Sequence, residues 1–363
     1  MKNIIDFIKD KSYYFLGITV LLIIIVVIIS SCSLKSNSNS NSYLEIENKM
    51  VLASKEYYSN RKSKLPKNGE VKKVTINTLV ETKLLKKVLD PKNKNNVCQG
   101  FVEVKKVDND YSYIPFLTCK DNYEPEYLNE KIKLSKVDEY GNGIYPINSE
   151  YIFRGDEVKN YVMFNKQLWR IIKVDSAGDI ELILAKRTDD YYEWDTSYNV
   201  DMESSVGKND SYFNAEIRKT LVNYYNTNFT TDSKAKIVSK DLCVAKSGYE
   251  DNYDVSRDCS VLQKGEKIGL LKLSDYKIAS LDSSCNKISD HQCINSNYFS
   301  DENISTWLLN AFSKNSYKVF YLSGNVSYTS ANASKKLNPV IYLTHDAITV
   351  EGVGTQEKPY IIK

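Results

Sequence analysis

The pattern of apolar and polar positions divides the chain into an apolar run, a polar spacer and two regions of regular secondary structure. Residues 13–29 are apolar without interruption. Residues 36–42 read SNSNSNS, which is typical of a flexible spacer. Between residues 43 and 62 apolar side chains recur at helical spacing, and the segment opens on the capping-box sequence S-Y-L-E. The pattern therefore predicts that a helix restarts directly after the spacer.

The apolar run is long enough to cross a membrane, and it also has the features of a signal peptide. Residues 12–34 carry no charge, and as a helix they would extend roughly 34 Å, enough to span a bilayer core. Lysines are more frequent before the run than directly after it, which favours a cytoplasmic N-terminus. Residues 29–32, Ile-Ser-Ser-Cys, resemble a bacterial lipobox, so Cys32 is a candidate lipidation site. Whether the run is a retained span or a cleaved signal, the remaining chain is expected outside the cytoplasm at the cell membrane.

The six cysteines beyond the run are expected to form disulfides, because an extracytoplasmic compartment is oxidising. The predicted pairs are Cys98–Cys119, Cys243–Cys259 and Cys285–Cys293. Two predicted strands, residues 100–107 and 111–119, are joined by Asp-Asn-Asp, a good turn sequence. With a two-residue loop at 108–109, Cys98 and Cys119 face each other across the hairpin, at a distance that a disulfide spans. The other two pairs bracket polar, loop-like segments and lack the Cys-x-x-Cys spacing of a zinc or redox site.

Further elements follow from the same apolar pattern. A short helix is predicted at residues 76–85, capped by Thr75. Strands are predicted at 161–164, 168–174, 180–185, 267–273, 339–343 and 348–351. Helices are predicted at 211–225 and 304–311, the first with Phe213, Ile217, Leu221 and Tyr224 directed inward.

Charge and composition remove several classes of function. The chain has 49 basic and 46 acidic residues, mostly interspersed, which gives no basis for a nucleic-acid partner. It has only two histidines, so most metal and proton-transfer chemistry lacks its usual residues. The acidic loop 250–254 does not have EF-hand spacing. Residues 352–355, GVGT, have no following helix and are predicted to form a turn rather than a phosphate loop. No catalytic residue, metal or cofactor is predicted.

Aromatic residues are the remaining chemical signal, since the chain contains 28 tyrosines. Tyr191, Tyr192 and Trp194 lie in one short segment, and Trp307 is a further candidate. Aromatic side chains with polar tips are suited to binding a sugar or peptide. The alternative is that these residues belong to the core of a chain with few phenylalanines.

The first region resembles the ectodomain of a type IV pilin or pseudopilin, which implies a helix packed on a small antiparallel sheet. The resembling segments are residues 43–62, 65–69, 76–91, 98–102 and 113–119. The chain differs from pilins because the apolar run has no pilin processing motif and the spacer interrupts the helix.

The second region resembles a domain of bacterial surface proteins that is distantly similar to the C-type-lectin-like fold of formylglycine-generating enzymes. The resembling segments are residues 151–155, 161–164, 169–172, 267–271, 275–276, 307–309, 324–326, 339–343, 352–355 and 359–360. The chain differs from this family at Asn310 and Asn338, two positions that could shape a ligand-facing region.

Together these observations predict an α+β protein with an N-terminal transmembrane or signal helix, a small pilin-like module and a larger lectin-like domain. The expected parts are a cytoplasmic segment (1–11), the membrane or signal segment (12–34), a linker (35–42), the pilin-like module (43–143) and the lectin-like domain (144–363). The expected function is non-catalytic adhesion or ligand binding, with the membrane and a glycan or surface protein as partners. The alternatives are an accessory component of a pilus or secretion apparatus, and an enzyme on a formylglycine-generating-enzyme-like fold.

Overall fold

The structure is a computed structural model that describes residues 38–107, 109–196, 212–250, 259–300 and 305–362. These residues form two compact units. The first holds the described residues up to Pro66 together with Val71–Val104 and Tyr113–Glu124. The second holds Lys67–Glu70, Lys105–Ser112 and the chain from Pro125 onward. The predicted membrane or signal segment lies outside the described residues, and no described helix is both long and apolar enough to span a bilayer.

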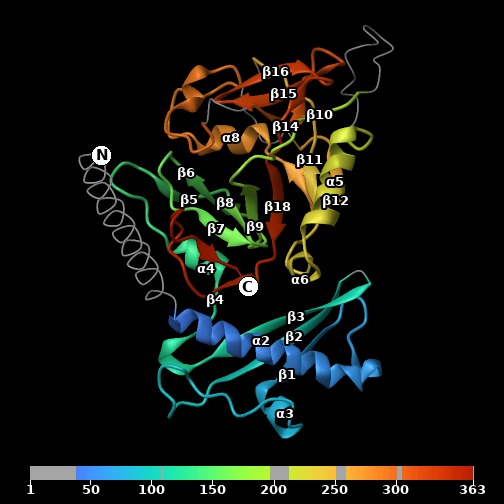
Figure 1. The fold of residues 1–363 in the computed structure, drawn as a ribbon. Coiled ribbons are helices and arrows are strands. Elements are labelled where there is room, and N and C mark those ends of the chain that lie inside the picture. Colours follow the sequence, from blue (N-terminus) through green and yellow to red (C-terminus); the bar gives the residue numbers. More distant parts are fainter. Residues whose placement is uncertain (1–37, 108, 197–211, 251–258, 301–304, 363) are drawn as a thin grey trace, which may run out of the picture. The chain divides into compact units, whose positions relative to one another are not determined.

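The first unit consists of a long helix and a three-stranded sheet (Figure 1). Its elements are α2 (Ser38–Ser59), η1 (Lys62–Lys64), β1 (Val71–Thr75), α3 (Ile76–Glu81), β2 (Gln99–Val107), β3 (Asp110–Thr118) and η2 (Lys120–Asn122). The strand order is β1-β2-β3. Met50 and Ala53 of α2 are buried, as their helical spacing predicts. Thr75 caps α3, since its hydroxyl accepts a hydrogen bond from the amide of Thr78 at 3.1 Å.

The hairpin of β2 and β3 has the register that the cysteine positions predict. Cys98 and Cys119 form a disulfide, with Cα atoms 4.3 Å apart. Phe101 and Phe116, which are equally distant from the loop, stack with ring centroids 4.8 Å apart. The prediction of this pair from hairpin geometry is therefore confirmed.

The second unit is built on an eight-stranded sheet. Six strands run in the order β13-β18-β9-β8-β6-β5, while β7 pairs with β8 and β20 pairs with β7. The strands are β5 (Gly143–Ile147), β6 (Glu150–Arg154), β7 (Tyr161–Phe164), β8 (Gln167–Val174), β9 (Ile180–Leu184), β13 (Gly269–Leu270), β18 (Pro339–Leu343) and β20 (Tyr360–Ile361). Every pairing is antiparallel except that of β20 with β7.

Smaller sheets and short helices complete the second unit. The sheets are β14 (Thr306–Ala311), β15 (Lys318–Ser323) and β16 (Asn325–Ser330); β10 (Tyr192–Glu193) with β17 (Ser334–Lys335); β11 (Lys240–Cys243) with β12 (Leu262–Glu266); and β4 (Glu126–Tyr127) with β19 (Ile348–Thr349). The helices are α4 (Leu128–Lys133), α5 (Glu216–Asn228), α6 (Thr231–Lys234), α8 (Leu273–Ala279) and η3 (His291–Ile294). In Figure 1, α8 lies between the large sheet and the β14–β16 sheet.

The two faces of the large sheet differ in polarity, and a bulge in β8 maintains the difference. Residues directly opposite each other on neighbouring strands share a face. Trp169 lies opposite Leu184 and belongs to the apolar face, whereas Lys173 lies opposite Glu181. Strict alternation from Trp169 would place Lys173 on the apolar face. The register shifts between Ile171 and Lys173, so one extra residue returns Lys173 to the polar face.

The prediction of an α+β fold is wrong for the described chain, whereas the transmembrane or signal helix predicted with it lies outside the described residues. Antiparallel sheets dominate the described chain, and helices are few. Only α2 and α5 among the described helices exceed eight residues. The physical reason is that short apolar runs do not distinguish a buried strand from a buried helix by periodicity.

Three predictions about single elements or residues are also wrong. Residues 304–311, predicted as a helix, contain β14, all six residues of which are buried. The predicted strand 267–273 is shortened to β13, and α8 begins at Leu273. Phe213, predicted to face inward, precedes α5 and is 57% exposed.

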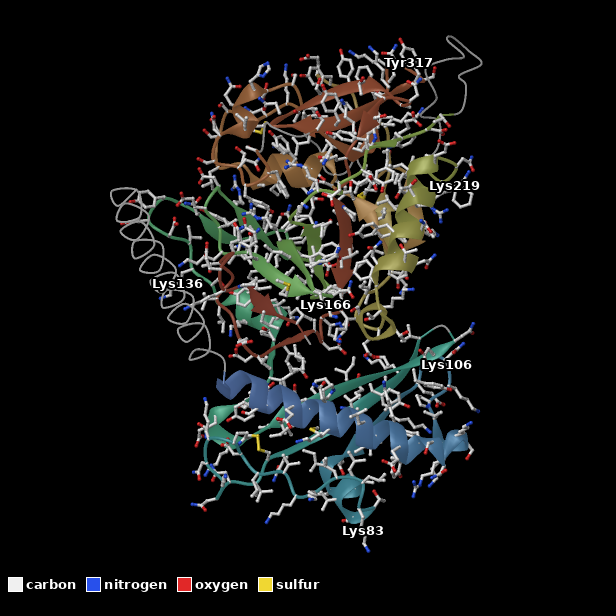
Figure 2. All side chains as sticks on the ribbon, in the orientation of Figure 1. Lys83, Lys106, Lys136, Lys166, Lys219 and Tyr317 are labelled. Atoms are coloured by element: carbon white, nitrogen blue, oxygen red, sulfur yellow. A yellow bond between two sulfur atoms is a disulfide. The ribbon has the colours of Figure 1, made fainter. Side chains whose placement is uncertain are left out.

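Many lysine side chains lie on the surface in both units, whereas Lys173 and Lys272 are largely buried. Lys83, Lys136 and Lys219 are exposed and extend away from the ribbon in Figure 2.

Candidate functional site

The polar face of the large sheet brings together the side chains with the most distinctive chemistry in the second unit. Arg170 lies opposite Tyr161 on one side and Ile183 on the other. One step along the same face, Glu181 lies between Lys173 and Tyr342. The sheet therefore carries Arg170 and an ion network on the same face.

The turn between β7 and β8 positions Arg170. Asn165 and Lys166 have φ angles of 51° and 61°, values that a two-residue hairpin turn requires. This turn pairs Tyr161 with Arg170. The Arg170 guanidinium lies 4.6 Å from the Tyr161 ring centroid and 4.5 Å from that of Tyr298. The cation is thus clamped between two aromatic rings.

Two of the three guanidinium nitrogens of Arg170 are used to hold it in place. Nε donates to Oδ1 of Asn160 at 2.9 Å, and Nη1 donates to the backbone oxygen of Tyr298 at 3.1 Å. Nη2 makes no hydrogen bond with a described residue, and no described carboxylate forms an ion pair with Arg170. Burial lowers the pKa of Arg170, although a guanidinium remains charged. The chain therefore presents a fixed cation with one free donor group.

Arg170 lines a cavity of about 210 Å³. Trp307 and Phe299 contribute aromatic walls, and Thr306 and Asn338 contribute polar groups. The Nδ2 atom of Asn338 donates to the backbone oxygen of Leu184 at 2.9 Å. We call this site the Arg170 cavity.

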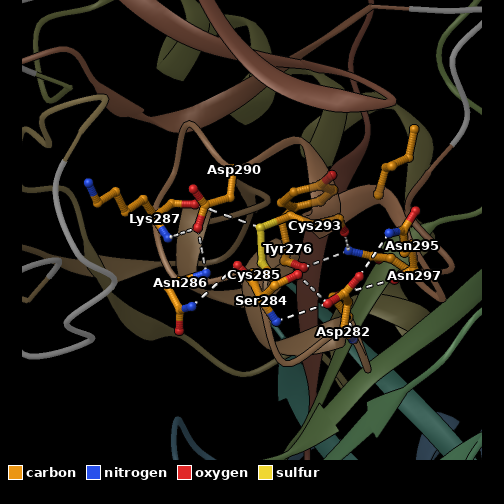
Figure 3. Close-up of a disulfide and its surroundings, with 12 residues drawn as sticks. Tyr276, Asp282, Ser284, Cys285, Asn286, Lys287, Asp290, Cys293, Asn295 and Asn297 are labelled. Carbon is orange, nitrogen blue, oxygen red and sulfur yellow. Dashed lines mark hydrogen bonds between the residues drawn. A yellow bond between two sulfur atoms is a disulfide. The ribbon is translucent and has the colours of Figure 1, made fainter.

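The Cys285–Cys293 disulfide loop holds the segment that supplies Tyr298 (Figure 3). Asn297, directly before Tyr298, donates from Nδ2 to the backbone oxygens of Cys293 and Tyr276, each at 2.9 Å. The loop itself is fixed by Asp290, whose carboxylate accepts two backbone amides. One wall of the Arg170 clamp consequently depends on a disulfide-stapled loop.

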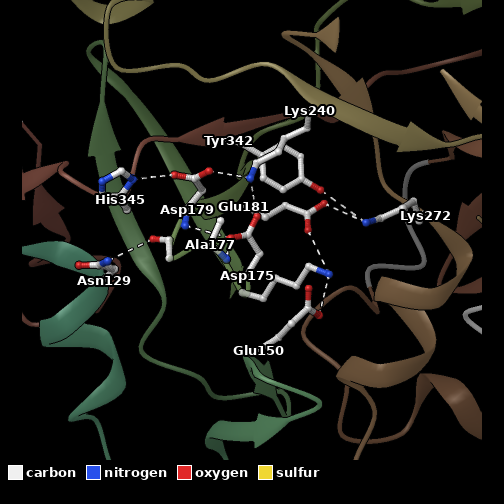
Figure 4. A network of polar contacts seen from close by, with 12 residues as sticks. Asn129, Glu150, Asp175, Ala177, Asp179, Glu181, Lys240, Lys272, Tyr342 and His345 are labelled. Atoms are coloured by element: carbon white, nitrogen blue, oxygen red, sulfur yellow. Dashed lines mark hydrogen bonds and ion pairs between the residues drawn. The ribbon is translucent and has the colours of Figure 1, made fainter. Parts of the chain in front are cut away.

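A buried ion network, drawn in Figure 4, lies on the same face of the sheet as Arg170. Lys173 Nζ is 3.0 Å from a carboxylate oxygen of Glu150, 3.7 Å from one of Glu181 and 3.8 Å from one of Asp275. Lys272 Nζ is 3.2 Å from Asp275 and 3.5 Å from Glu181. Three carboxylates therefore share two ammonium groups.

Burial and the neighbouring charges shift the pKa values of the groups in this network. Burial, and then the neighbouring charge of Asp275, raise the pKa of Glu181. Burial lowers the pKa of both lysines, but the nearby carboxylates outweigh it, so the pKa values of Lys173 and Lys272 are raised overall. Burial also raises the pKa of Tyr298 well above its usual range, with Arg170 acting in the opposite direction. The network favours charged lysines and a readily protonated Glu181.

A second cavity, of about 400 Å³, opens over the ion network. Lys173, Lys272 and Asp275 line it together with Lys240. Lys240 Nζ is itself paired, at 2.7 Å from Asp175 and 2.6 Å from Asp179. The cations of this cavity are neutralised by the chain's own carboxylates, which distinguishes it from the Arg170 cavity.

The aromatic residues predicted to bind ligand lie in three different environments. Trp194 and Trp307 are each 1% exposed and belong to the core, whereas Tyr191 is 61% exposed. Trp307 Nε1 donates to the backbone oxygen of Tyr192 at 2.7 Å. Only Trp307 among these residues lines the Arg170 cavity.

The remaining residues that the sequence singled out are the cysteines, the acidic loop and the histidines. All three predicted disulfides are present. Cys32 and most of the acidic loop, residues 251–258, lie outside the described residues. His291 is exposed. Within the described ranges, no cluster of three or more His, Cys, Asp or Glu residues has the geometry of a metal site.

Asn310 and Asn338 were predicted to shape a ligand-facing region, and the structure places them in different surroundings. Asn338 lines the Arg170 cavity. Asn310 is buried, with Oδ1 accepting from the amide of Leu273 and Nδ2 donating to Ala245. It therefore fixes the start of α8.

Sequence reasoning missed Arg170, although a signal was present. An arginine within the apolar strand sequence L-W-R-I-I is unusual, because unpaired charges are rarely buried. A two-residue turn at Asn165 and Lys166 would also have paired it with Tyr161. Tyr298 carried no such signal, because it comes from a distant loop.

Comparisons with known proteins found no relative of this chain. No protein-family model matches the chain, and neither the curated proteins nor the solved structures contain a significant match.

Proposed function

We propose that this protein is a membrane-anchored bacterial surface protein that acts outside the cytoplasm by adhesion or ligand binding, without catalysis. The N-terminal apolar run supports the anchor. The three disulfides support an oxidising compartment.

The observation that carries the binding proposal is the Arg170 cavity. It combines aromatic walls with a fixed guanidinium whose Nη2 has no partner among the described residues. Concave sites with apolar walls and a few oriented polar groups are typical of ligand binding. The site lies in a disulfide-stapled unit whose walls are preorganised.

The enzyme alternative receives no support from the cysteines. A formylglycine-type oxidase would require two free thiols for copper, whereas the six described cysteines are joined in pairs. The proposal accordingly assigns them a structural role.

A glycan array with the full-length chain in detergent tests the proposal. The wild type should bind a subset of glycans, and Arg170→Lys should reduce the signal while a cooperative melting curve shows that the variant is still folded. Arg61→Lys is a matched control, because Arg61 also lies over a tyrosine ring, 4.4 Å from the centroid of Tyr57, in the first unit. Equal binding by all three proteins would contradict the assignment to the Arg170 cavity.

The anchor is tested separately by the intact mass of protein extracted from membranes. A retained span gives the mass of the uncleaved chain, and lipidation gives that of a chain beginning at a modified Cys32. An unmodified chain released without detergent would contradict the anchor.

A further inference from the structure

We propose that the Arg170 cavity binds an acidic sugar residue, whose single carboxylate pairs with Nη2 of Arg170. This inference rests on the proposed binding function and specifies its ligand class. The first observation is that Arg170 has no carboxylate partner among the described residues. Enclosing a cation without a carboxylate partner is costly, yet the described residues offer Arg170 only neutral acceptors and aromatic rings. A ligand anion would supply the missing partner.

The guanidinium is oriented before any ligand arrives. Asn160, Tyr298 and Tyr161 fix its plane through two hydrogen bonds and two ring contacts. Little side-chain freedom is therefore left to lose on binding, which increases affinity. Arginine is also the side chain best suited to planar carboxylates.

The charges around the cavity are mixed, because Arg187 lines it together with Arg170 and the ion network lies on the same face of the sheet. The pKa of Tyr298 responds to charges of both signs, since Arg170 lowers it while Asp275 and Glu181 raise it. The ion network has one carboxylate more than it has lysines. A single ligand carboxylate would be balanced by Arg170, whose two hydrogen bonds go to neutral acceptors.

The size and walls of the cavity favour one sugar ring. A volume of about 210 Å³ is below the ~300–1,000 Å³ typical of sites for drug-sized ligands. Trp307 and Phe299 provide apolar walls for the carbon face of a ring, and Thr306 and Asn338 provide polar groups for its hydroxyls. A uronic acid residue combines these features with a single carboxylate.

The test compares the binding of methyl β-D-glucuronide and methyl β-D-glucoside to the full-length chain in detergent. The two sugars differ only at C6, which is a carboxylate in the first and a hydroxymethyl group in the second. Calorimetric titration should detect binding of the glucuronide, and at least about tenfold weaker binding of the glucoside. Inorganic phosphate should compete less well than the glucuronide. Arg170→Lys should weaken glucuronide binding about tenfold, because the lysine ammonium would not be held at the position of Nη2 by Asn160 and Tyr298.

Asn338→Asp provides a second variant of nearly unchanged shape. The new carboxylate should repel the glucuronide and abolish its binding, while binding to any neutral glycan found on the array persists. Arg61→Lys should bind like the wild type. Melting curves of each variant establish that it is folded.

Three outcomes would overturn the inference. Equal affinity for glucuronide and glucoside, unaffected by Arg170→Lys, would overturn the ligand class but leave the binding function standing. Binding of a peptide through its free C-terminal carboxylate, without glucuronide binding, would overturn the sugar assignment alone. If the glucuronide did not bind, and if Arg170→Lys gave the same glycan-array signal as the wild type, both proposals would be overturned.

Discussion

Lys173 is the residue on which the buried ion network depends, because it approaches three carboxylates. Lys173→Met should destabilise the second unit by about 3–5 kcal/mol, since removal of one partner leaves buried charge uncompensated. Unfolding by urea measures the loss.

Lys186→Met is the matched control for this prediction. Lys186 pairs with Asp189 on the surface, where both side chains are 83% exposed, and solvent screens such pairs. The control should unfold like the wild type. Similar small losses in both variants would show that the network contributes nothing particular to stability.

Glu181 should make stability dependent on pH. Burial and Asp275 raise its pKa, so the native state binds this proton more tightly than the unfolded chain. Its contribution is fully present below the unfolded pKa of about 4.3 and is lost as pH rises toward the native value. Lys173, Lys272 and Tyr342 also face this carboxylate.

Glu181→Gln should remove this component of the pH dependence. The free energy of unfolding, measured by urea titration from about pH 4 to pH 8, should fall less steeply for the variant. A slope identical to that of the wild type would mean that Glu181 keeps the same pKa in both states.

At this scale the sequence predicts pairs that are close along the chain and misses distant ones. The position of Cys98 opposite Cys119 followed from loop length alone. Tyr161 opposite Arg170 follows from the same argument applied to a two-residue turn. Tyr298, by contrast, reaches Arg170 through tertiary packing of a loop 128 residues away, which no periodicity encodes.

At the scale of elements, the Cys285–Cys293 loop connects stability to the binding site. Replacing both cysteines by serine should weaken ligand binding, because the loop holds Asn297 and thereby Tyr298. The measurement is the dissociation constant for methyl β-D-glucuronide.

The Cys98–Cys119 disulfide is the control for this effect. Replacing both of these cysteines by serine should destabilise the first unit by about 3 kcal/mol, for a loop of 21 residues, and leave ligand binding unchanged. If both double variants bound equally well, the loop would have no role in positioning Tyr298.

Element prediction succeeded where the local pattern was decisive. The three strands β7, β8 and β9 and the cap of α3 are confirmed. The segment of β14 was misassigned because apolar residues cover both of its faces, which removes the alternation that identifies a strand. Trp194 and Trp307 are each 1% exposed, which agrees with the alternative that these aromatic residues belong to the core; composition alone does not reveal burial.

At the scale of the whole molecule, two compact units should unfold separately. Scanning calorimetry should show two transitions. The loss of Cys98–Cys119 should lower only the first unit's transition, and Lys173→Met should lower only that of the second. A single transition moved by both changes would contradict independent unfolding.

The change from the expected α+β fold to a mainly antiparallel structure also belongs to this scale. Strand order depends on pairings between distant segments, such as β18 with β9, which the pattern along one strand does not specify. The polar face of the sheet is therefore visible only once the register is known. It is this face that carries the binding proposal.

The most direct test of the account is a crystal structure of the full-length chain with methyl β-D-glucuronide. The account predicts the sugar in the Arg170 cavity, with a carboxylate oxygen within hydrogen-bonding distance of Nη2 of Arg170. A sugar bound elsewhere, with Nη2 paired to a carboxylate of the chain itself, would contradict it.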